Sequence, residues 1–388
     1  MDFELDDALL SLQQTARRFA DEKIAPVAAE YDASGKFPRE ILRMAWELGL
    51  SHVFIPEEQG GLGLSAVGAC VVVEELARGC SGITTSILSN DLGLTPLLVG
   101  GSKEQQREWL APCAEQFKVL AFALSEPGAG SDVAGLQLHA EKSGNDYVLN
   151  GTKAWITNGG EADLYTVFAT LDRHSRHKGI CAFVLPRESP GLSPGKKEDK
   201  MGQRASDTRV LHFDNVRVPA AQRLGAEGEG FKIAMATLDR TRPLIGALAT
   251  GIARRALEES LAYAAERKAF GQAIGEFQAV QFMLADMAKD IEASRLLTFQ
   301  SAWMLDRGMR ASKQSSMAKC FSTDAAMKAT TDAVQIFGGN GYTKEYPVEK
   351  LMRDAKLMQI YEGTNHVQAS LRNVKAMPLM PYVLALFS

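Results

Sequence analysis

The middle of the chain differs from both ends in its pattern of apolar residues, and this difference most limits the possible folds. From about residue 6 to 118, apolar residues recur every three or four positions, as in amphipathic helices. Between about 119 and 225, short alternating segments such as 164–168 and 180–185 are separated by Gly, Asn, Asp and Pro, as in β-strands. From 230 onwards the helical period returns, with its main break at 335–342. The sequence therefore predicts one small β domain between two helical domains.

The length supports this division, because 388 residues exceed what one hydrophobic core usually serves. The changes of pattern place the boundaries near 118 and 226. We predict an α+β multidomain protein with an N-terminal helical domain at 1–118 and a central β-barrel or β-sandwich domain at 119–226. A C-terminal four-helix bundle is expected at 227–388.

The charge composition argues against nucleic-acid and membrane partners. Lys and Arg number 43 and Asp and Glu 47, giving a formal net charge of −4, so there is no basic excess for a polyanion. The five cysteines are scattered without a Cys-x-x-Cys pair, which favours a reducing compartment and no metal site. The acidic start and the lack of an apolar run of about eighteen residues favour a cytoplasmic protein, or a processed organellar form.

A lone carboxylate, Glu362, stands beside a glycine near the C-terminus, within 360–364. Taken alone, such a Glu is most often a solvated surface charge. Its neighbours Leu357, Met358 and Ile360 are apolar, and an apolar pocket raises the pKa of a carboxyl. The glycine-rich segment 335–342 also allows close approach of a ligand to the backbone. Glu362 is therefore a candidate base for taking a proton from carbon.

Several separated motifs occur in a definite order, and together they carry a family resemblance. They are Leu124-Ser125-Glu126-Pro127-Gly128-Ala129-Gly130-Ser131-Asp132, Lys153-Ala154-Trp155-Ile156-Thr157-Asn158-Gly159, Met201-Gly202-Gln203-Arg204, Glu266-Arg267-Lys268-Ala269-Phe270-Gly271 and the two C-terminal segments. With this set, nearly the whole chain resembles the acyl-CoA dehydrogenases, and it is most similar to their short- and medium-chain branch. One glycine motif would be weak support, whereas an ordered set is strong.

The resemblance implies dehydrogenation of an acyl-CoA, with Glu362 as the base. No side chain can accept a hydride, so a cofactor must. No Gly-x-Gly-x-x-Gly motif of a βαβ nucleotide-binding unit is present, which favours FAD over a nicotinamide. The family further implies an electron-transfer flavoprotein as electron acceptor and a homotetramer, or a dimer.

The resemblance also implies the residues that contact each ligand. The FAD contacts would be Phe122, Leu124, Ser125, Gly130, Ser131, Trp155, Ile156, Thr157, Arg267, Phe270, Gln278, Gln335, Gly338, Gly339, Thr364 and Asn365. Of these, Arg267, Phe270 and Gln278 would hold the pyrophosphate and adenine side together with 335–339 of a neighbouring subunit. Acyl-CoA would contact Ser131, Asp239, Arg242 and Gly363.

Three of these residues also have ordinary structural interpretations. Trp155 could instead pack in a core, Arg267 could form an exposed ion pair, and Asp239 could start a helix.

The position of the base can be compared with other branches of the family. The isovaleryl and long-chain branches place their Glu at the position of Thr241, whereas this chain has its carboxylate at Glu362. One base is therefore present, at one of two alternative positions.

Asp91 departs from the Ser or Thr that the family usually has on the segment lining the acyl pocket. An ionised carboxylate facing an alkyl chain is costly, so a pocket-facing Asp91 would act as a second base. That role suits an alicyclic enoyl-CoA such as cyclohex-1-ene-1-carboxyl-CoA, oxidised to a conjugated diene. The alternatives are that Asp91 caps a helix beginning at Leu92, and that the substrate is an ordinary straight- or branched-chain acyl-CoA.

Two other functions are weaker alternatives. An acyl-CoA oxidase usually carries a long C-terminal extension, and a DNA-associated flavoprotein relative would need a basic C-terminal domain. Neither feature occurs in this sequence.

Overall fold

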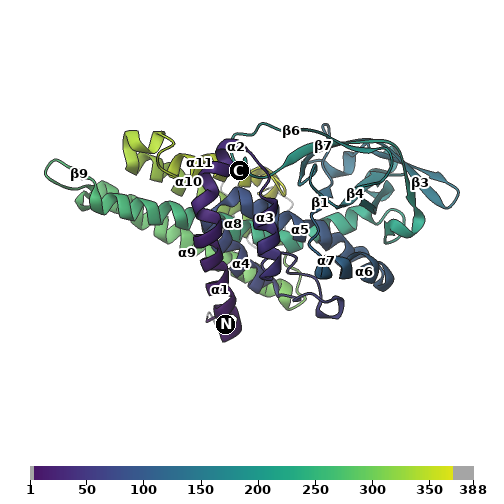
Figure 1. The fold of residues 1–388 in the computed structure, drawn as a ribbon, viewed down its shortest axis with the longest axis horizontal. Helices are drawn as coiled ribbons and strands as arrows, with labels where there is room; N and C mark the ends of the chain where they lie inside the picture. Colours follow the sequence, from purple (N-terminus) through teal and green to yellow (C-terminus); the bar gives the residue numbers. More distant parts are fainter. Residues whose placement is uncertain (1–3, 370–388) are drawn as a thin grey trace, which may run out of the picture.

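The computed structural model describes residues 4–369, and it confirms the α+β architecture. Figure 1 shows the β domain at one end of the long axis and helices over the remainder of the molecule. A short hairpin lies at the opposite end. Among residues 4–369, no helix combines the length and apolar character needed to cross a membrane.

The N-terminal region is helical. Its helices are α1 Asp7–Phe19, α2 Ala28–Ser34, α3 Arg39–Glu47, α4 Ala66–Gly79, α5 Ser81–Gly100, α6 Lys103–Trp109 and α7 Ala111–Glu115. Helix α6 begins with a capping box, in which the side chains of Ser102 and Gln105 each accept a hydrogen bond from the other's backbone N–H. Helices α4 and α5 are buried over most of their length, so they form the centre against which the other elements pack.

The central region forms one mixed sheet. Its strands are β1 Leu120–Ala123, β2 His139–Ser143, β3 Asp146–Thr157, β4 Leu164–Thr170, β5 Ile180–Pro186, β6 Leu192–Lys197, β7 Thr208–Pro219 and β8 Arg223–Leu224. The order is β6-β7-β3-β2-β4-β5-β8, with β1 parallel to β4. The register of β3 with β7 shifts between Lys153 and Ile156, and this bulge redirects the side chains of the end of β3.

The C-terminal region begins with the long helix α8 and forms a bundle. Its elements are α8 Gly230–Glu266, β9 Lys268–Ala269, β10 Gln272–Ala273, α9 Gln278–Asp306, α10 Ser312–Phe337, α11 Val348–Met358 and α12 Asn365–Gln368. Helices α8, α9 and α10 pack against one another, and α11 packs on α8 and α10. Short 3-10 or π turns lie at Ala20–Ile24, Ala25–Val27, Glu57–Gln59, Val133–Gly135, Arg173–Gly179, Ala220–Gln222, Ile274–Glu276 and Gly338–Tyr342.

The three regions meet at short connections. Helix α7 ends at Glu115 before β1, and β8 ends at Leu224 before α8 begins at Gly230. We therefore keep 118 and 226 as proposed domain boundaries; residues 370–388 of the third domain lie outside the described residues.

Three apolar cores lie among residues 4–369. One lies within the sheet, and a second packs α1 and α3 against α4 and α5. The third joins the regions, because it runs from α4 and α5 past one face of the sheet into α8, α10 and α11. The junction of α5, α8 and the sheet is therefore rigid, and it frames the site described below.

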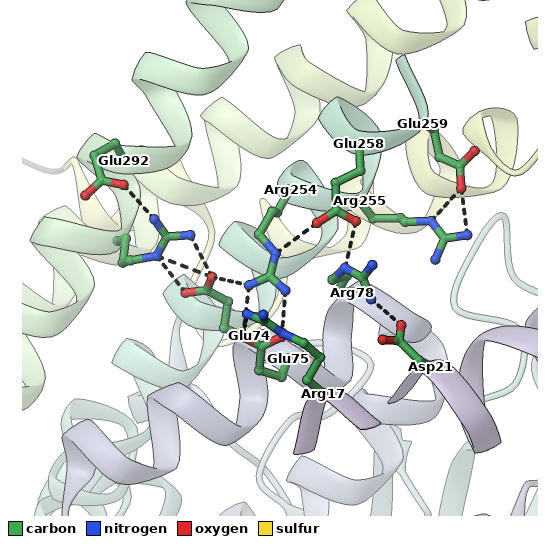
Figure 2. Close-up of polar contacts among 11 residues, drawn as sticks. Arg17, Asp21, Glu74, Glu75, Arg78, Arg254, Arg255, Glu258, Glu259 and Glu292 are labelled. Atoms are coloured by element: carbon green, nitrogen blue, oxygen red, sulfur yellow. Dashed lines mark hydrogen bonds and ion pairs between the residues drawn. The ribbon is translucent and has the colours of Figure 1, made fainter. Parts of the chain in front are cut away.

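A buried charge cluster also joins the N-terminal helices to the bundle (Figure 2). Arg254 of α8 lies 2.9 Å from Glu74 and 2.6 Å from Glu75, both on α4. Arg17 of α1 reaches Glu75 at 2.9 Å, and Arg295 of α9 reaches Glu74 at 2.8 Å. Four helices from two regions of the chain thus share two buried carboxylates.

Candidate active site

Glu362 lies in the turn after α11 and faces α8. Its backbone is left-handed, with φ 51°, and the next residue, Gly363, has φ 90°. Thr241 Oγ1 donates a hydrogen bond of 2.9 Å to Glu362 Oε2. Burial raises the pKa of Glu362 to about 7, although the Thr241 hydroxyl and the charges of Arg242 and Lys319 act to lower it. A carboxyl with this pKa can accept a proton near neutral pH.

Two connected cavities open onto Glu362. The inner cavity, of about 220 Å³, has mostly apolar walls from α5, β1 and α8. These walls comprise Leu88 and Leu92 of α5, Phe122 of β1, and Met235, Leu238 and Ile245 of α8. The outer cavity, of about 530 Å³, shares Trp155, Thr157 and Glu362 with the inner one. A flat ring system and an acyl chain could therefore meet beside one carboxylate.

The sheet supplies an open cradle at this junction. Trp155 stands at the bulge of β3 with φ 61° and is 64% exposed, so the alternative that it packs in a core is wrong. No atom lies within 4 Å of the position that a Cβ would take at Gly128 or Gly130. The loop therefore leaves room for a cofactor beside Trp155, and the residues present fit FAD.

A buried ion pair holds the cradle in place. Lys153 Nζ donates to the Leu124 carbonyl and to Glu126 Oε1, both at 2.8 Å. Glu126 also accepts the backbone N–H groups of Gln137 and Leu138. The strand that carries Trp155 and the loop that begins at Leu124 are thus fixed relative to each other.

Half of the predicted cofactor residues gather around the inner cavity. They are Phe122, Leu124, Ser125, Gly130, Ser131, Trp155, Ile156 and Thr157. Thr364 lines the outer cavity.

The remaining predicted cofactor residues, apart from Asn365, lie around the hairpin of β9 and β10, at the opposite end of the molecule from the β domain (Figure 1). They are Arg267, Phe270, Gln278, Gln335, Gly338 and Gly339. Phe270 is 97% exposed, and the ends of α8 and α10 are held together there by stacking of Tyr263 on Phe337. Within one chain, these six residues therefore do not lie beside the cradle formed by Trp155 and the loop after Leu124.

Comparison with known proteins decides the family. The N-terminal, middle and C-terminal domains of acyl-CoA dehydrogenases match residues 6–116, 121–216 and 228–373. The chain belongs to the acyl-CoA dehydrogenase family. The predicted enzyme class, an oxidoreductase acting on a CH–CH bond with flavin, and the FAD cofactor are thereby confirmed.

Relatives resemble the chain along almost its whole length. The probable acyl-CoA dehydrogenase fadE25 of Mycobacterium leprae is 45% identical over 367 residues, 94% of each chain. The solved structure of butyryl-CoA dehydrogenase from Megasphaera elsdenii has a TM-score of 0.93 at 41% identity and covers 100% of both chains. A chain solved in work on the electron transferring flavoprotein of Acidaminococcus fermentans has a TM-score of 0.94 at 45% identity, covering 97% of this chain and 99% of that one.

Three of the four predicted substrate contacts line the cavities beside Glu362, whereas Asp239 lines neither of them. Arg242 and Ser131 line the inner cavity, and Gly363 lines both cavities. Asp239 Oδ1 accepts a 2.7 Å hydrogen bond from Arg242 Nη1 and so orients the guanidinium. Asp239 lies inside α8, so the alternative that it starts a helix is wrong.

Asp91 lies apart from the residues that line the two cavities. Its carboxylate accepts the backbone N–H groups of His52 at 3.1 Å and Phe54 at 3.2 Å. Asp91 is in the middle of α5, so the prediction of a cap for a helix beginning at Leu92 is wrong. Instead it ties the loop after α3 to α5. Burial raises its pKa to about 7. Asp91 lines neither of the two cavities beside Glu362, but with Leu88 it lines a separate small one.

Asn365 turns its side chain towards α10, away from the cavities. Its Oδ1 accepts from Lys319 Nζ at 2.8 Å, and its Nδ2 donates to Asp324 Oδ1 at 2.7 Å. It therefore anchors the turn and does not face the cofactor cradle.

Sequence reasoning missed Lys319 and Tyr361. Tyr361 lines both cavities, and Lys319 is fully buried behind the turn that carries Glu362. A signal for Lys319 existed: it shares the small-residue face of α10 with Ser315, Ser322 and Ala326, where a charge is unexpected. No group of His, Cys, Asp and Glu suited to a metal ion occurs in the part of the chain that the structure describes.

Proposed function

We propose that this protein is an FAD-dependent dehydrogenase of short- or medium-chain, straight or branched acyl-CoA, with Glu362 as the catalytic base. The observation that carries the proposal is a buried carboxylate with a pKa of about 7 that faces the same cavity as Trp155 and Thr157. Bound FAD supplies the acceptor for the hydride that leaves the β-carbon. Glu362 takes the α-proton, and the apolar walls exclude water from it.

The surrounding residues orient the carboxylate and the substrate. Thr241 holds one carboxylate oxygen, which leaves the other free to accept the proton. Arg242, oriented by Asp239, presents its remaining donors to polar groups of the coenzyme A ester. The limited volume of the inner cavity, about 220 Å³, favours a short acyl group.

An alicyclic substrate has weaker support. That hypothesis requires Asp91 to exchange a proton with the acyl chain, yet both Asp91 oxygens accept backbone N–H groups of the loop after α3. We therefore propose α,β-dehydrogenation of an ordinary acyl-CoA. Faster flavin reduction by cyclohex-1-ene-1-carboxyl-CoA than by butyryl-CoA would reverse this choice.

We further propose that one FAD site is built from two copies of the chain, within a homotetramer. Exposed Arg267 and Phe270 would meet the cradle of a neighbouring copy, because their hairpin lies at the opposite end of the molecule from the β domain, which supplies the cradle (Figure 1). Electron transfer to an electron-transfer flavoprotein and a cytoplasmic location complete the proposal.

The test is anaerobic mixing of the purified protein with butyryl-CoA. We expect the flavin absorbance to bleach, and Glu362→Gln to retain FAD while reduction slows by about a hundredfold or more, the usual scale of a general base. Reduction at the wild-type rate in Glu362→Gln would contradict the assignment of the base. A folded protein that cannot be reconstituted with FAD would contradict the whole proposal.

A further inference from the structure

We propose that Lys319 of α10 is a positioning residue for Glu362, because it holds the turn that carries the carboxylate and faces it with a fixed positive charge. This inference rests on the proposed function of Glu362 as the base. Lys319 does not line either cavity, so its effect on the reaction is exerted through Glu362.

The ammonium group of Lys319 is buried and directed at the turn. Lys319 Nζ donates to the Gly363 carbonyl and to Asn365 Oδ1, each at 2.8 Å. These acceptors are neutral, although a buried cation is normally stabilised by an anion in contact with it. A neutral donor could form the same two hydrogen bonds at a smaller cost of desolvation. The hydrogen bonds alone therefore do not explain why a charged group is present at this position.

The turn needs such a clamp because its backbone is strained. Glu362 adopts φ 51°, which residues with a Cβ rarely adopt. The Glu362 carbonyl accepts from Gln368 Nε2 at 3.2 Å, and the Gly363 carbonyl accepts from Lys319. With both carbonyl groups fixed, the carboxylate is directed at Thr241.

The charge of Lys319 also acts on Glu362. From α8, Glu362 faces Thr241 and Arg242; from α10 it faces Lys319; and Tyr361 precedes it in the turn. Asp239 pairs with Arg242 at 2.7 Å and offsets its charge. The hydrogen-bond acceptors of Lys319 are uncharged, and the carboxylate of Asp324 on the same helix acts on Lys319 from beyond Asn365. Burial lowers the pKa of Lys319 to about 8, so the ammonium remains charged at neutral pH and stabilises the Glu362 carboxylate.

The decisive variant is Lys319→Met, which removes the charge and the two hydrogen bonds. We expect the apparent pKa of flavin reduction to rise by about one pH unit, within the range for loss of a nearby opposite charge. From a starting value near 7, reduction at pH 7 then slows by about fivefold and recovers at alkaline pH. A ¹³C NMR titration measures the pKa of the Glu362 carboxyl without turnover and should show the same rise. The Glu362 signal is identified by its absence in the spectrum of Glu362→Gln.

Two variants separate charge from structure. Lys328→Met makes the same substitution on the same helix, at a lysine that pairs with Asp290 on the surface. It should leave the pH profile of flavin reduction unchanged. Thr323→Val removes a hydroxyl that bonds Asn365 but keeps the charge, so it should slow reduction without moving the pKa. A Lys319→Met protein with wild-type pKa would overturn the proposal, whatever its rate.

A reciprocal measurement covers the case in which Lys319→Met does not fold. Coupling between two groups is mutual, so the pKa of Lys319, followed by ¹⁵N NMR, should fall when Glu362→Gln removes the carboxylate. An equal Lys319 pKa in both proteins would refute the coupling. By contrast, full flavin reduction by Glu362→Gln would refute the proposed function itself, so the two failures are distinguishable.

Discussion

At the scale of single residues, the site brings together the two sequence positions at which the family resemblance predicts a base. Thr241 Oγ1 and Glu362 Oε2 are 2.9 Å apart, although 121 residues separate them in the sequence. The side chains at the two positions therefore reach the same place, so a carboxylate at either position could serve the same site. In this chain the hydroxyl of Thr241 donates a hydrogen bond to Glu362, the proposed base.

Thr241→Val should make Glu362 a stronger base that is less often ionised at neutral pH. The hydroxyl bonds the charged carboxylate and so lowers its pKa. Without it, the pKa should rise above its value of about 7, and flavin reduction at pH 7 should slow a few-fold and recover at higher pH. The control is Thr250→Val in the same helix, whose hydroxyl bonds only the Gly246 carbonyl. An unchanged pH profile in Thr241→Val would contradict this role.

The sequence predicted the residues of the site better than their orientation. Motif residues such as Trp155 and Thr157 line the cavities because backbone turns and a bulge fix their positions. The direction of Asn365 depended on contacts with α10, which are more than forty residues away in the sequence. Such long-range contacts leave no local pattern to read.

At the scale of elements, α5 is the least predictable helix. It is apolar and buried around nearly its whole circumference, so no periodicity identifies its pocket-facing side. It begins at Ser81 without a side-chain cap, whereas α6 begins at a recognisable capping box. The start of α5 and the direction of Asp91 therefore could not be derived from the sequence.

Asp91→Asn should weaken the fold and spare the reaction. One backbone N–H of the loop at 52–54 loses its acceptor, which costs about 1–3 kcal/mol of unfolding free energy. The rate of flavin reduction by butyryl-CoA should change little, whereas a second base would require a large loss. The exposed Asp132→Asn is the control for stability.

The same variant has a distinct pH dependence. Burial raises the folded-state pKa of Asp91 to about 7, above the unfolded value of about 3.9. The neutral carboxyl of Asp91 therefore stabilises the folded state. This contribution to the free energy of unfolding is fully present below the unfolded pKa and is lost as the pH rises through 7. Asn does not titrate. The loss of unfolding free energy in Asp91→Asn relative to the wild type, measured by urea unfolding, should therefore be larger at acidic pH than at pH 8. A loss of unfolding free energy that grows with pH would contradict the raised pKa of Asp91.

At the scale of the whole molecule, the charge cluster on α1, α4, α8 and α9 should limit acid stability (Figure 2). Burial alone raises the pKa of Glu75, but hydrogen bonds and charges from Arg254 and Arg17 outweigh it, so the pKa lies below its usual value. This stabilisation is present above the unfolded pKa of about 4.3 and is lost as the pH falls through the folded value.

Glu75→Gln should destabilise the fold strongly at neutral pH. It leaves buried Arg254 with one fewer anionic partner, and breaking a buried pair typically costs about 3–5 kcal/mol. Glu292→Gln removes an exposed partner of Arg295 and should cost less than about 1 kcal/mol. Thermal unfolding at pH 7 compares the two, and equal shifts in Tm would contradict a special role for the buried carboxylates.

The proposed division of one FAD site between two chains can be tested by complementation. Trp155→Ala removes a cradle residue, and Arg267→Ala removes a residue at the far end of the same chain (Figure 1). Each variant alone should bind FAD poorly, because every site in its homo-oligomer contains one defect. A hybrid pair contains one site with both defects and one with neither, since a two-fold axis exchanges the two ends.

Co-expression of the two variants should therefore restore FAD binding to about a quarter of the sites, because random pairing makes about half of the pairs hybrid and each hybrid has one intact site. FAD content after gel filtration, normalised to protein, measures this fraction. The control is a co-expressed pair of Trp155→Ala and Thr157→Ala, whose defects lie in the same cradle and cannot separate. If both pairs retain equally little FAD, each chain binds its cofactor alone, and the exposure of Phe270 and Arg267 needs another explanation.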